Sequence, residues 1–359
     1  MQTYRRLLEP YMGIEKPLIY DLTLDELIES VTHLGSEPYR ARQLWHGIYG
    51  QLSLDPDQIQ TLPGELRLSL KKTFRFASLQ ETTSVHSEDG ATEKALYRLD
   101  DGTSIEAVLM RYERRRTACI STQAGCAMGC VFCATGQMGF QRNLTAGQIV
   151  EQVLHISRRL KRDSDRLTNI VVMGMGEPFH NFDATLRAVD ILNDPDGFNF
   201  GARRFTISTV GLVPMIERFT RLNSQVNLAI SLHAATDALR ESLLPVNRRY
   251  PLKALMAACR EYVERTKRRI SFEWALIEGV NDTPGQAEAL ADWIRGMNCH
   301  VNLIPLNPTR GYQGLASRDE NVSRFQALLE GYGISTTVRL RRGIEIQAGC
   351  GQLATEESA

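Results

Sequence analysis

The sequence lacks the features that mark membrane-spanning, secreted and disordered proteins. None of its 359 residues lies in an uninterrupted apolar run of the ~18 residues that suggest a membrane-spanning helix. Residues 1–6 carry no apolar core like that of a secretory signal peptide. Hydrophobic residues make up 43% of the chain and charged residues 23%, which is ordinary for a globular protein. We therefore expect a cytoplasmic protein with no membrane partner.

A net charge is also missing, since 42 basic residues balance 42 acidic ones. Any contact with nucleic acid must therefore depend on local basic clusters and not on the overall field. Each cluster fits either a phosphate contact or an ordinary solvated surface, because helix ends commonly carry Lys and Arg. The clusters lie at residues 114–116, 158–162, 203–204, 248–249, 267–269 and 339–342.

The seven cysteines do not have the pattern of a disulfide framework. Their number is odd, and Cys126, Cys130 and Cys133 lie within eight residues in the spacing C-x3-C-x2-C. No neighbouring Cys or His supplies a fourth ligand. A cubane iron–sulfur cluster takes one thiolate for each iron, so three cysteines leave one iron open to an exchangeable ligand. A zinc site completed by a distant histidine is the alternative.

Residues 1–90 predict a small helical domain. Apolar residues recur at helical spacing in 23–29 and 42–49, and Thr23 with Glu26 has the form of a capping box. Four side chains of this segment either grip RNA or belong to the core and the solvated surface: Arg40, Arg42, Trp45 and Tyr49.

Beyond residue 90 the hydrophobic period changes to two, and residues 91–116 predict a β-hairpin turned at Asp101 and Gly102. Residues 117–340 then alternate short apolar runs with amphipathic helices, one of them capped by Thr145. The apolar runs lie near 117–122, 169–173, 204–209, 226–232, 270–277 and 300–306. We therefore predict an α/β fold built on a partial (β/α)6 barrel, followed by a C-terminal tail at 341–359.

The uncommon residues of this region follow the carboxyl ends of the predicted strands. Residues 174–178 come after the second strand, while Ser208, His233 and Asn307 stand at or after later ends. In (β/α) barrels this rim carries the active site. Each residue alone has an ordinary explanation as a turn or a packed side chain, but together they predict one site. Within 174–178 the glycines permit close approach of a ligand, and Glu177 is suited to pair with an amine.

The spacing of Cys126, Cys130 and Cys133 resembles that of radical S-adenosylmethionine enzymes. Nearly the whole chain is similar to the RlmN and Cfr type of RNA adenine methyltransferase, and most similar to the dual-specificity RlmN branch. Residues 39–45 are similar to the accessory RNA-binding domain of that family. The segments that carry the resemblance are 119–126, 132–136, 174–178, 230–233, 302–308 and 348–353.

The resemblance implies a radical SAM barrel and an unusual methyl transfer. One S-adenosylmethionine methylates Cys350, and a second binds the open iron of a [4Fe-4S] cluster held by Cys126, Cys130 and Cys133. Cleavage of the second molecule yields a deoxyadenosyl radical, which takes hydrogen from the methyl group on Cys350. The resulting carbon radical adds to the adenine ring.

By the same resemblance, Cys119 releases the product by closing a disulfide with Cys350. Glu106 corresponds to a carboxylate that accepts the ring proton, although locally it is only an alternating strand residue. The residues that correspond to S-adenosylmethionine contacts are Gly176, Glu177, Ser208, Ser231, Leu232, His233 and Asn307.

The implied partners are 23S rRNA, tRNA and an external one-electron donor such as a flavodoxin or ferredoxin. The expected product is adenosine methylated at C2 in 23S rRNA and beside the tRNA anticodon, and the RNA must present an unstacked base. Methylation of the same ribosomal adenine at C8 is the close alternative. A noncatalytic RNA-binding protein with a structural metal is the remote one.

Overall fold

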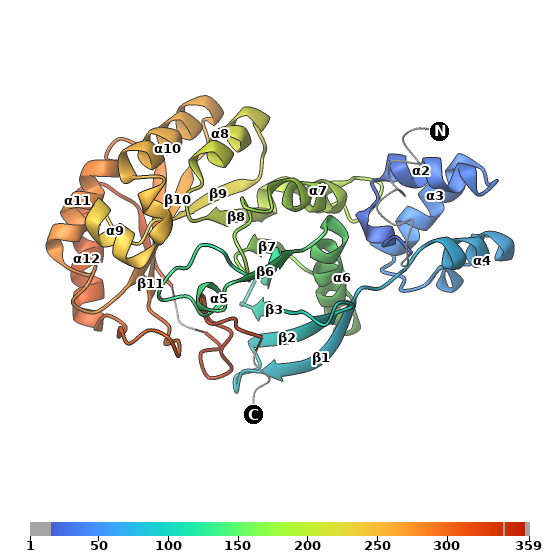
Figure 1. Cartoon of the computed structure of the whole chain (residues 1–359), viewed down its shortest axis with the longest axis horizontal. Coiled ribbons are helices and arrows are strands. Elements are labelled where there is room, and N and C mark those ends of the chain that lie inside the picture. Colours follow the sequence, from blue (N-terminus) through green and yellow to red (C-terminus); the bar gives the residue numbers. More distant parts are fainter. Residues whose placement is uncertain (1–15, 340–341, 356–359) are drawn as a thin grey trace.

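The computed structural model describes residues 16–339 and 342–355. Residues 1–6, from which no signal peptide is expected, lie outside the described residues, as do parts of the basic cluster 339–342 and of the tail. Figure 1 shows the N-terminal helices at one end of the elongated molecule and the helix-covered sheet at the other. Within the described residues, no helix is both long and apolar enough to span a membrane.

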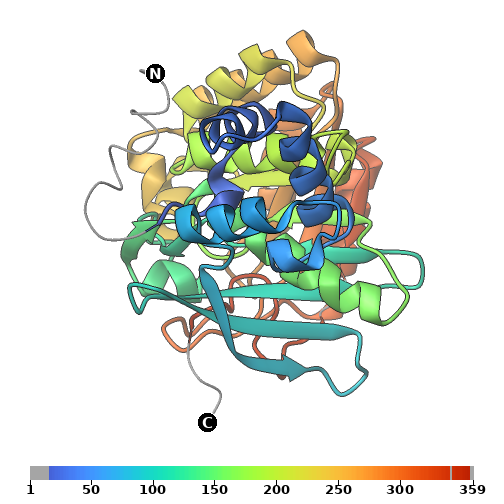
Figure 2. The ribbon, with the colours of Figure 1, turned by 90° about the vertical axis from the view of Figure 1, so that its right-hand side faces the viewer.

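The N-terminal segment is helical up to Thr73. Its helices are α2 (Leu24–His33), α3 (Pro38–Trp45) and α4 (Gly64–Thr73), joined by the short turns η2 (Ile19–Asp21), η3 (His46–Gly50) and η4 (Pro56–Gln58). The predicted capping box is present, because the Thr23 hydroxyl accepts from Glu26 N while the Glu26 carboxylate accepts from Thr23 N. Figure 2 shows these helices in front of the barrel.

Trp45 and Tyr49 belong to the core and do not form a stacking surface. They are 1% and 2% exposed, and their rings lie 4.3 Å apart. The Trp45 indole Nε1 donates to Asp194 Oδ1 at 3.1 Å, and the Arg42 guanidinium pairs with Asp196 at 2.7 Å. These contacts attach the N-terminal helices to the loop that follows α7 (Phe182–Asn193) of the barrel.

Three antiparallel strands, β1 (Leu79–His86), β2 (Thr92–Leu99) and β3 (Ser104–Arg111), connect the helices to the barrel. The predicted hairpin is β2–β3, in which Ala95 lies opposite Ala107. The strand β1 was not expected, since the helical pattern was extended to residue 90. It is mostly polar and joins the sheet through backbone hydrogen bonds to β2, so its sequence carries little hydrophobic signal.

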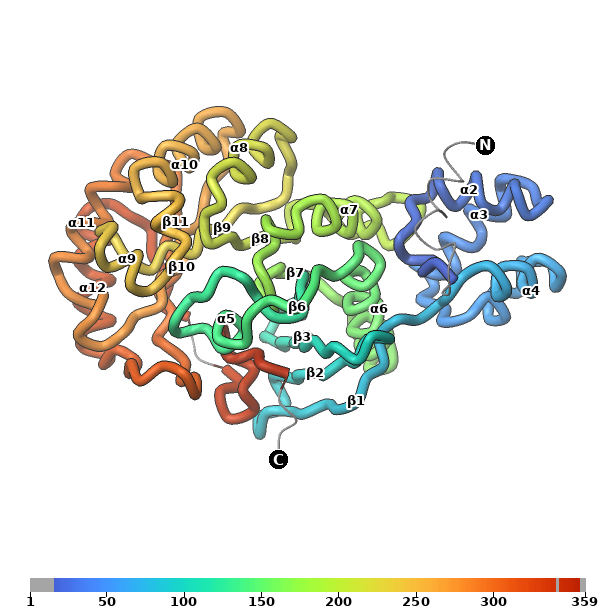
Figure 3. The backbone as a smooth tube through the Cα atoms, in the orientation of Figure 1, coloured from blue at the N-terminus to red at the C-terminus, as the bar shows by residue number. Residues whose placement is uncertain are grey.

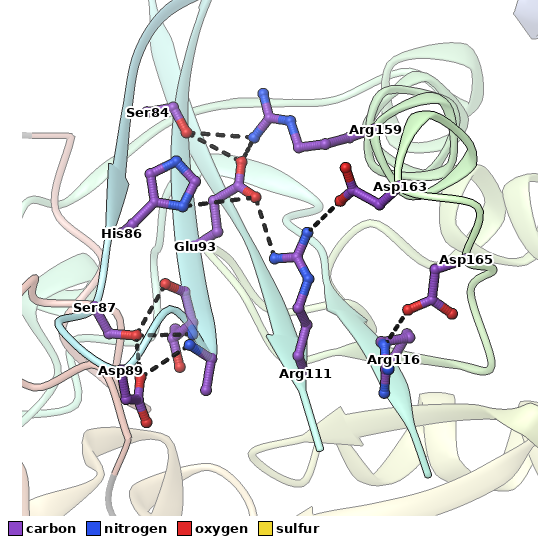
Figure 4. A network of polar contacts seen from close by, with 12 residues as sticks. Ser84, His86, Ser87, Asp89, Glu93, Arg111, Arg116, Arg159, Asp163 and Asp165 are labelled. Carbon is purple, nitrogen blue, oxygen red and sulfur yellow. Dashed lines mark hydrogen bonds and ion pairs between the residues drawn. The ribbon is translucent and has the colours of Figure 1, made fainter. Parts of the chain in front are cut away.

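A buried carboxylate fastens these strands to α6 (Ala146–Arg162). Glu93 is 2% exposed, forms an ion pair with Arg159 on α6, and lies 3.5 Å from the Arg111 guanidinium. The Ser84 hydroxyl donates to Glu93 at 3.1 Å. In Figure 4, Glu93 lies between the two guanidinium groups. Because a buried charge is costly unless it is paired, this network favours one placement of the strands against the helix.

The predicted α/β barrel is confirmed as a continuous sheet. Its strand order is β1-β2-β3-β4-β7-β8-β9-β10-β11-β12, and all neighbours from β4 onward are parallel. The parallel strands are β4 (Arg116–Cys119), β7 (Asn169–Val172), β8 (Phe205–Thr209), β9 (Asn227–Ser231), β10 (Ile270–Leu276), β11 (Cys299–Pro305) and β12 (Thr336–Val338). The three-residue strand β12 adds a seventh parallel strand to the six that were predicted.

Helices cover the outside of the parallel part of this sheet, and the carboxyl ends of the parallel strands share one rim. As predicted, Thr145 caps α6 with Gln148. A separate pair of strands, β5 (Gln123–Gly125) and β6 (Phe140–Asn143), brackets the cysteine loop at this rim. The remaining helices are α5 (Ala134–Gln137), α8 (Val213–Leu222), α9 (Asp237–Leu243), α10 (Leu252–Thr266), α11 (Pro284–Ile294) and α12 (Asp319–Gly331), with the turns η5 (Ala202–Arg204) and η6 (Pro245–Arg248).

Candidate active site

A cavity of ≈ 230 Å³ opens at the carboxyl rim of the parallel strands. It collects residues from six strand ends, the cysteine loop and residues 342–355, which we call the C-terminal strap. Five cysteines line it: Cys119, Cys126, Cys130, Cys133 and Cys350. Six further residues singled out in the sequence also line it: Gly176, Glu177, Ser208, Ser231, His233 and Asn307. Leu232, expected as a cosubstrate contact, and Glu106, expected as the proton acceptor, do not line the cavity.

The cysteine loop begins at Gly125, in a backbone conformation and a space that only glycine fits. Gly125 has φ +69°, and a Cβ there would lie 1.9 Å from the Gly139 carbonyl oxygen. Cys126 N donates to the same carbonyl at 2.9 Å, which brings the loop back over the rim. Burial raises the pKa of the Cys126 thiol to about 12. A ligand that needs thiolates must therefore compensate for this desolvation with positive charge of its own.

The three loop thiols fit a cluster better than a single ion. Within the described residues, no three His, Cys, Asp or Glu side chains converge closely enough to hold one metal ion. A mononuclear zinc site needs such convergence, because each Zn–S bond is only about 2.3 Å. In a cubane, by contrast, each thiolate binds its own iron and the sulfurs stay farther apart.

An orphaned polar atom marks the place of a polar ligand in the same cavity. Asn307 Oδ1 is buried without a hydrogen-bond partner, while Asn307 Nδ2 donates to the Cys350 carbonyl at 3.0 Å. Buried acceptors are nearly always satisfied in folded proteins. A donor group of a bound small molecule would satisfy this one, so the residues present fit a polar cosubstrate beside the thiols.

Glu177 is anchored with its carboxylate facing the cavity. Its two oxygens accept from Phe179 N at 2.9 Å and Val210 N at 2.8 Å. Burial nevertheless raises the Glu177 pKa to about 7, because the two hydrogen bonds do not offset desolvation. Gly176 precedes it with φ +98°, and a Cβ there would lie 2.6 Å from the Gln123 side chain. The glycine is thus required by both conformation and space.

His233 is a neutral rim residue. Its ring Nδ1 accepts a hydrogen bond from Ala275 N at 2.9 Å, which leaves Nε2 as the protonated nitrogen. Burial, with a smaller contribution from Arg240, lowers the pKa of His233 to about 3. The ring lies 5.1 Å from Phe132 of the cysteine loop. Ser208 and Ser231 complete this side of the cavity with their hydroxyl oxygens 3.2 Å apart.

The C-terminal strap carries Cys350 to the cavity. Ala134 N donates to the Gly351 carbonyl at 2.7 Å, and the Thr135 hydroxyl donates to the Leu353 carbonyl at 2.6 Å. Both donors lie in α5, directly after the cysteine loop. Figure 3 shows the C-terminal segment in red beside α5. Two regions more than 200 residues apart in sequence therefore form one wall.

Cys119 and Cys350 differ in environment, and both are free thiols. Cys119 is 8% exposed and its pKa is raised to about 12 by burial, whereas Cys350 is exposed. The disulfide expected between them is not present, which corrects that expectation. All seven cysteines lie within the described residues, and all are free.

Glu106 lies on β3 and points into a sealed interior. It is 1% exposed, its Oε1 lies 2.8 Å from Lys94 Nζ, and its Oε2 accepts from Ala354 N at 3.0 Å. Leu232 is fully buried, and its carbonyl accepts from Arg240 Nε at 3.1 Å. In this arrangement both residues are buried behind the residues that line the cavity.

Sequence reasoning did not identify Lys94 or Arg240 as parts of this site. Arg240 is fully buried and also donates to the Val210 carbonyl at 2.6 Å, so it braces two rim loops. Neither residue stands in a recognisable motif, and Lys94 follows the polar residues Thr92 and Glu93, so its position in the sequence gives no sign of its burial.

The comparisons with known proteins show the family of this chain. Residues 120–293 match the model of the Radical SAM superfamily. Dual-specificity RNA methyltransferase RlmN 1 of Myxococcus xanthus is 52% identical, covering 93% of this chain and 93% of its own. A probable dual-specificity RNA methyltransferase RlmN of Geobacillus kaustophilus is 44% identical over 95% of this chain and 93% of its own.

A solved structure has the same fold. The crystal structure of a radical SAM methyltransferase from Sphaerobacter thermophilus superimposes with a TM-score of 0.93. It is 52% identical and covers 95% of this chain and 100% of its own. The chain belongs to the radical SAM superfamily and, within it, to the RlmN family.

Proposed function

We propose that this protein methylates C2 of an adenosine in 23S rRNA, and of the adenosine beside the anticodon in tRNA, using two S-adenosylmethionine molecules per turnover. The observation that carries the proposal is the meeting of two sets of thiols in one cavity. Cys126, Cys130 and Cys133 form one wall, and the exposed thiol of Cys350 reaches the same space on the C-terminal strap.

Adenine C2 requires such an arrangement. This carbon lies between two ring nitrogens and is electron-poor, so it does not attack a sulfonium methyl group as an ordinary nucleophile. A thiolate does, which makes Cys350 the acceptor of the first methyl group and the carrier that presents it to the base. The Cys350 side chain is exposed while its carbonyl is held by Asn307, so the carrier is accessible but its backbone is positioned.

The [4Fe-4S] cluster that Cys126, Cys130 and Cys133 would hold supplies, with S-adenosylmethionine, the radical chemistry that activates the methyl group on Cys350.

The cosubstrate contacts are assigned to residues of the same cavity. Glu177 is assigned to hold the cosubstrate amine, and Asn307 Oδ1 to accept from one of its donors. Ser208 and Ser231 offer hydroxyls to the ribose or carboxylate, while neutral His233 offers its Nε2–H. Gly176 is assigned a backbone contact with the cosubstrate, and Gln123 fills the space that a side chain at this position would need.

Cys119 is assigned the release of the product from Cys350, since both thiols line the cavity. Glu106 is assigned the removal of the ring proton. In the arrangement seen here its carboxylate is held by Lys94 and by the strap at Ala354. Proton removal by Glu106 therefore requires the contact with Ala354 to break, so that the carboxylate can face the base.

The proposed partners are 23S rRNA, tRNA and an external one-electron donor such as a flavodoxin or ferredoxin, and the proposed location is the cytoplasm, where these meet. Mass analysis of nucleosides from both RNAs, in cells with and without the gene, tests the function. Loss of 2-methyladenosine from both RNAs in the deletion strain is the expected result. The appearance of 8-methyladenosine in its place would assign the C8 reaction, and no change in either RNA would refute a role in adenosine methylation.

A further inference from the structure

A second hollow, of ≈ 620 Å³, lies at the opposite end of the barrel strands. It is formed where three chain segments enter the sheet, just before β8, β9 and β10. Four of its lining side chains are basic: Arg203, Lys267, Arg268 and Arg269. No carboxylate is among the lining residues, which are otherwise Thr, Ser, Gln and Asn.

Two of the four cations, Arg203 and Arg268, are held in place by uncharged amide oxygens. Gln225 Oε1 accepts from Arg203 Nε at 3.2 Å and from Arg268 Nη1 at 3.1 Å. Asn227 Oδ1 accepts from Arg268 Nη2 at 2.8 Å. Amide oxygens order the guanidinium groups but carry no charge, so the positive potential remains available to an anion. Within the described residues, the four cations take part in no ion pair with a carboxylate.

The remaining lining groups add hydrogen-bond donors suited to phosphate oxygens. Thr206 and Ser271 lie at the amino ends of β8 and β10, and each brings a hydroxyl to the hollow. Arg is favoured for phosphate because its planar fork donates two parallel hydrogen bonds. Because four cations line the hollow and no carboxylate does, the set matches a ligand with several negative charges, such as a run of phosphodiesters, better than a single carboxylate or a neutral ligand.

The location of the hollow relates it to the N-terminal helices. Trp45 and Arg42 of the N-terminal helices contact Asp194 and Asp196 in the loop after α7. The chain continues from this loop to Arg203 at the rim of the hollow. Asn227 and Ser231 mark the two ends of β9, so the hollow and the active-site cavity are separated by roughly 13 Å along the strand. A folded RNA is long enough to contact both.

We propose that this hollow is a phosphate-binding site that takes the sugar–phosphate backbone of the RNA substrate, away from the methylated base. The inference rests on the proposed function for the identity of the RNA. The site supplies affinity and orientation and reads no bases, because its groups recognise phosphate oxygens. Its contribution must then fall as salt rises, through release of the counterions that surround the RNA.

The test compares two double variants of the cluster-loaded enzyme that each remove two positive charges. R203Q/R269Q alters the hollow at two exposed positions, whereas K253Q/R324Q alters exposed residues of α10 and α12 that line neither cavity. Fluorescence anisotropy with tRNA is measured between 50 and 200 mM KCl. For R203Q/R269Q we expect binding to weaken about tenfold and the slope of log K against log salt to fall by about 1.8. K253Q/R324Q is expected to keep the wild-type affinity and slope.

Kinetics separate this role from a catalytic one. With R203Q/R269Q the KM for RNA should rise while kcat at saturating RNA stays at the wild-type level. Equal RNA affinities for the two double variants, with both folded by circular dichroism, would overturn the proposal.

Inorganic phosphate is the probe for a small ligand. If phosphate at matched ionic strength protects wild-type Arg203 and Arg269 from a guanidinium-modifying reagent while both double variants bind RNA equally, the site takes a small phosphate and the RNA assignment is wrong. A wild-type enzyme that binds tRNA and is sensitive to R203Q/R269Q, yet methylates no RNA, would refute the proposed function and leave the backbone site standing.

Discussion

Lys94 and Glu106 form an ion pair that is sealed from solvent beside the active-site cavity. Lys94 Nζ lies 2.8 Å from Glu106 Oε1, and the two side chains are 5% and 1% exposed. They sit diagonally across the β2–β3 ladder, where Lys94 is opposite Val108 and Glu106 is opposite Leu96. The second carboxylate oxygen accepts from Ala354 N, so the pair also holds the C-terminal strap.

Replacing one partner of this pair should be more harmful than replacing both. Lys94→Met leaves the Glu106 carboxylate buried without its cation, which is expected to cost roughly 3–5 kcal/mol of unfolding free energy. The double variant K94M/E106M buries two apolar side chains and should recover much of that loss. Urea denaturation of the wild type, both single variants and the double variant gives the coupling energy. A Lys94→Met loss below about 1 kcal/mol would contradict the pairing.

Cys350→Ala should abolish RNA methylation and leave the cluster site intact. The side chain is exposed on the strap, so its truncation leaves no buried cavity. We expect unchanged iron content and visible absorbance, with no methylated adenosine detected by mass analysis. Cys299→Ala is the matched control, since Cys299 lies at the start of β11 and outside the active-site cavity. Methylation by Cys350→Ala at the rate of this control would refute the carrier role.

Gly176→Ala should weaken both folding and cosubstrate binding. The position has φ +98°, and the new Cβ would lie 2.6 Å from the Gln123 side chain and 2.9 Å from Gln123 N. Strain of this kind costs roughly 1–3 kcal/mol. Gly285→Ala provides the comparison, because it lies in α11 with nothing within 4 Å of its Cβ, and it should be neutral or stabilising by up to about 1 kcal/mol. Thermal unfolding and S-adenosylmethionine binding measure the two effects, and equal behaviour of the two variants would disprove the close approach at Gly176.

Glu177 should make the protein less stable as pH rises through the neutral range. Burial raises its pKa in the folded state to about 7 from an ordinary value of 4.5, so folding favours the protonated carboxyl. Its stabilising contribution is complete below pH 4.5 and is lost as pH approaches and passes 7, by at most about 3 kcal/mol. Glu177→Gln mimics the neutral form and removes this dependence. Its lost acceptor adds an offset that does not vary with pH.

The measurement is the unfolding free energy of wild type and Glu177→Gln at pH 5.0 and pH 7.5. The difference between the two proteins should shift in favour of Glu177→Gln at the higher pH. A difference that stays constant would show that the carboxyl is already ionised at pH 5.0. Binding of S-adenosylmethionine to the wild type should strengthen over the same interval, because its amine pairs with the ionised carboxylate.

Several elements of the fold followed from local patterns alone. The capping boxes at Thr23 and Thr145 and the hairpin at Asp101 depend on residues three to ten positions apart, so sequence spacing specifies them. The six predicted strands are present for the same reason, since each is a short apolar run between helical patterns. Strand β1 was not predicted, because it pairs with β2 through backbone hydrogen bonds and contains few apolar side chains.

The site followed from sequence where its chemistry is local and not where it depends on packing. The cysteine spacing and the residues at strand ends pointed to one rim, because parallel strands place their carboxyl ends together. The sealing of Glu106, the bracing by Arg240 and the hydrogen bond from Trp45 to Asp194 could not be read from spacing, since each depends on partners from distant segments.

The sequence by itself determined the chemical groups of the cavity and the alternation of strands and helices that builds the barrel. The first depends only on residue types, and the second on hydrophobic patterns within short segments. Only the tertiary structure decided which thiols share the space, with Cys350 brought beside the cysteine loop by hydrogen bonds from Ala134 and Thr135. It also decided that the cations before β8 and β10 surround one hollow. The physical reason is the same in both cases: such contacts form between segments that meet only after the sheet has closed, and no local pattern encodes their distance.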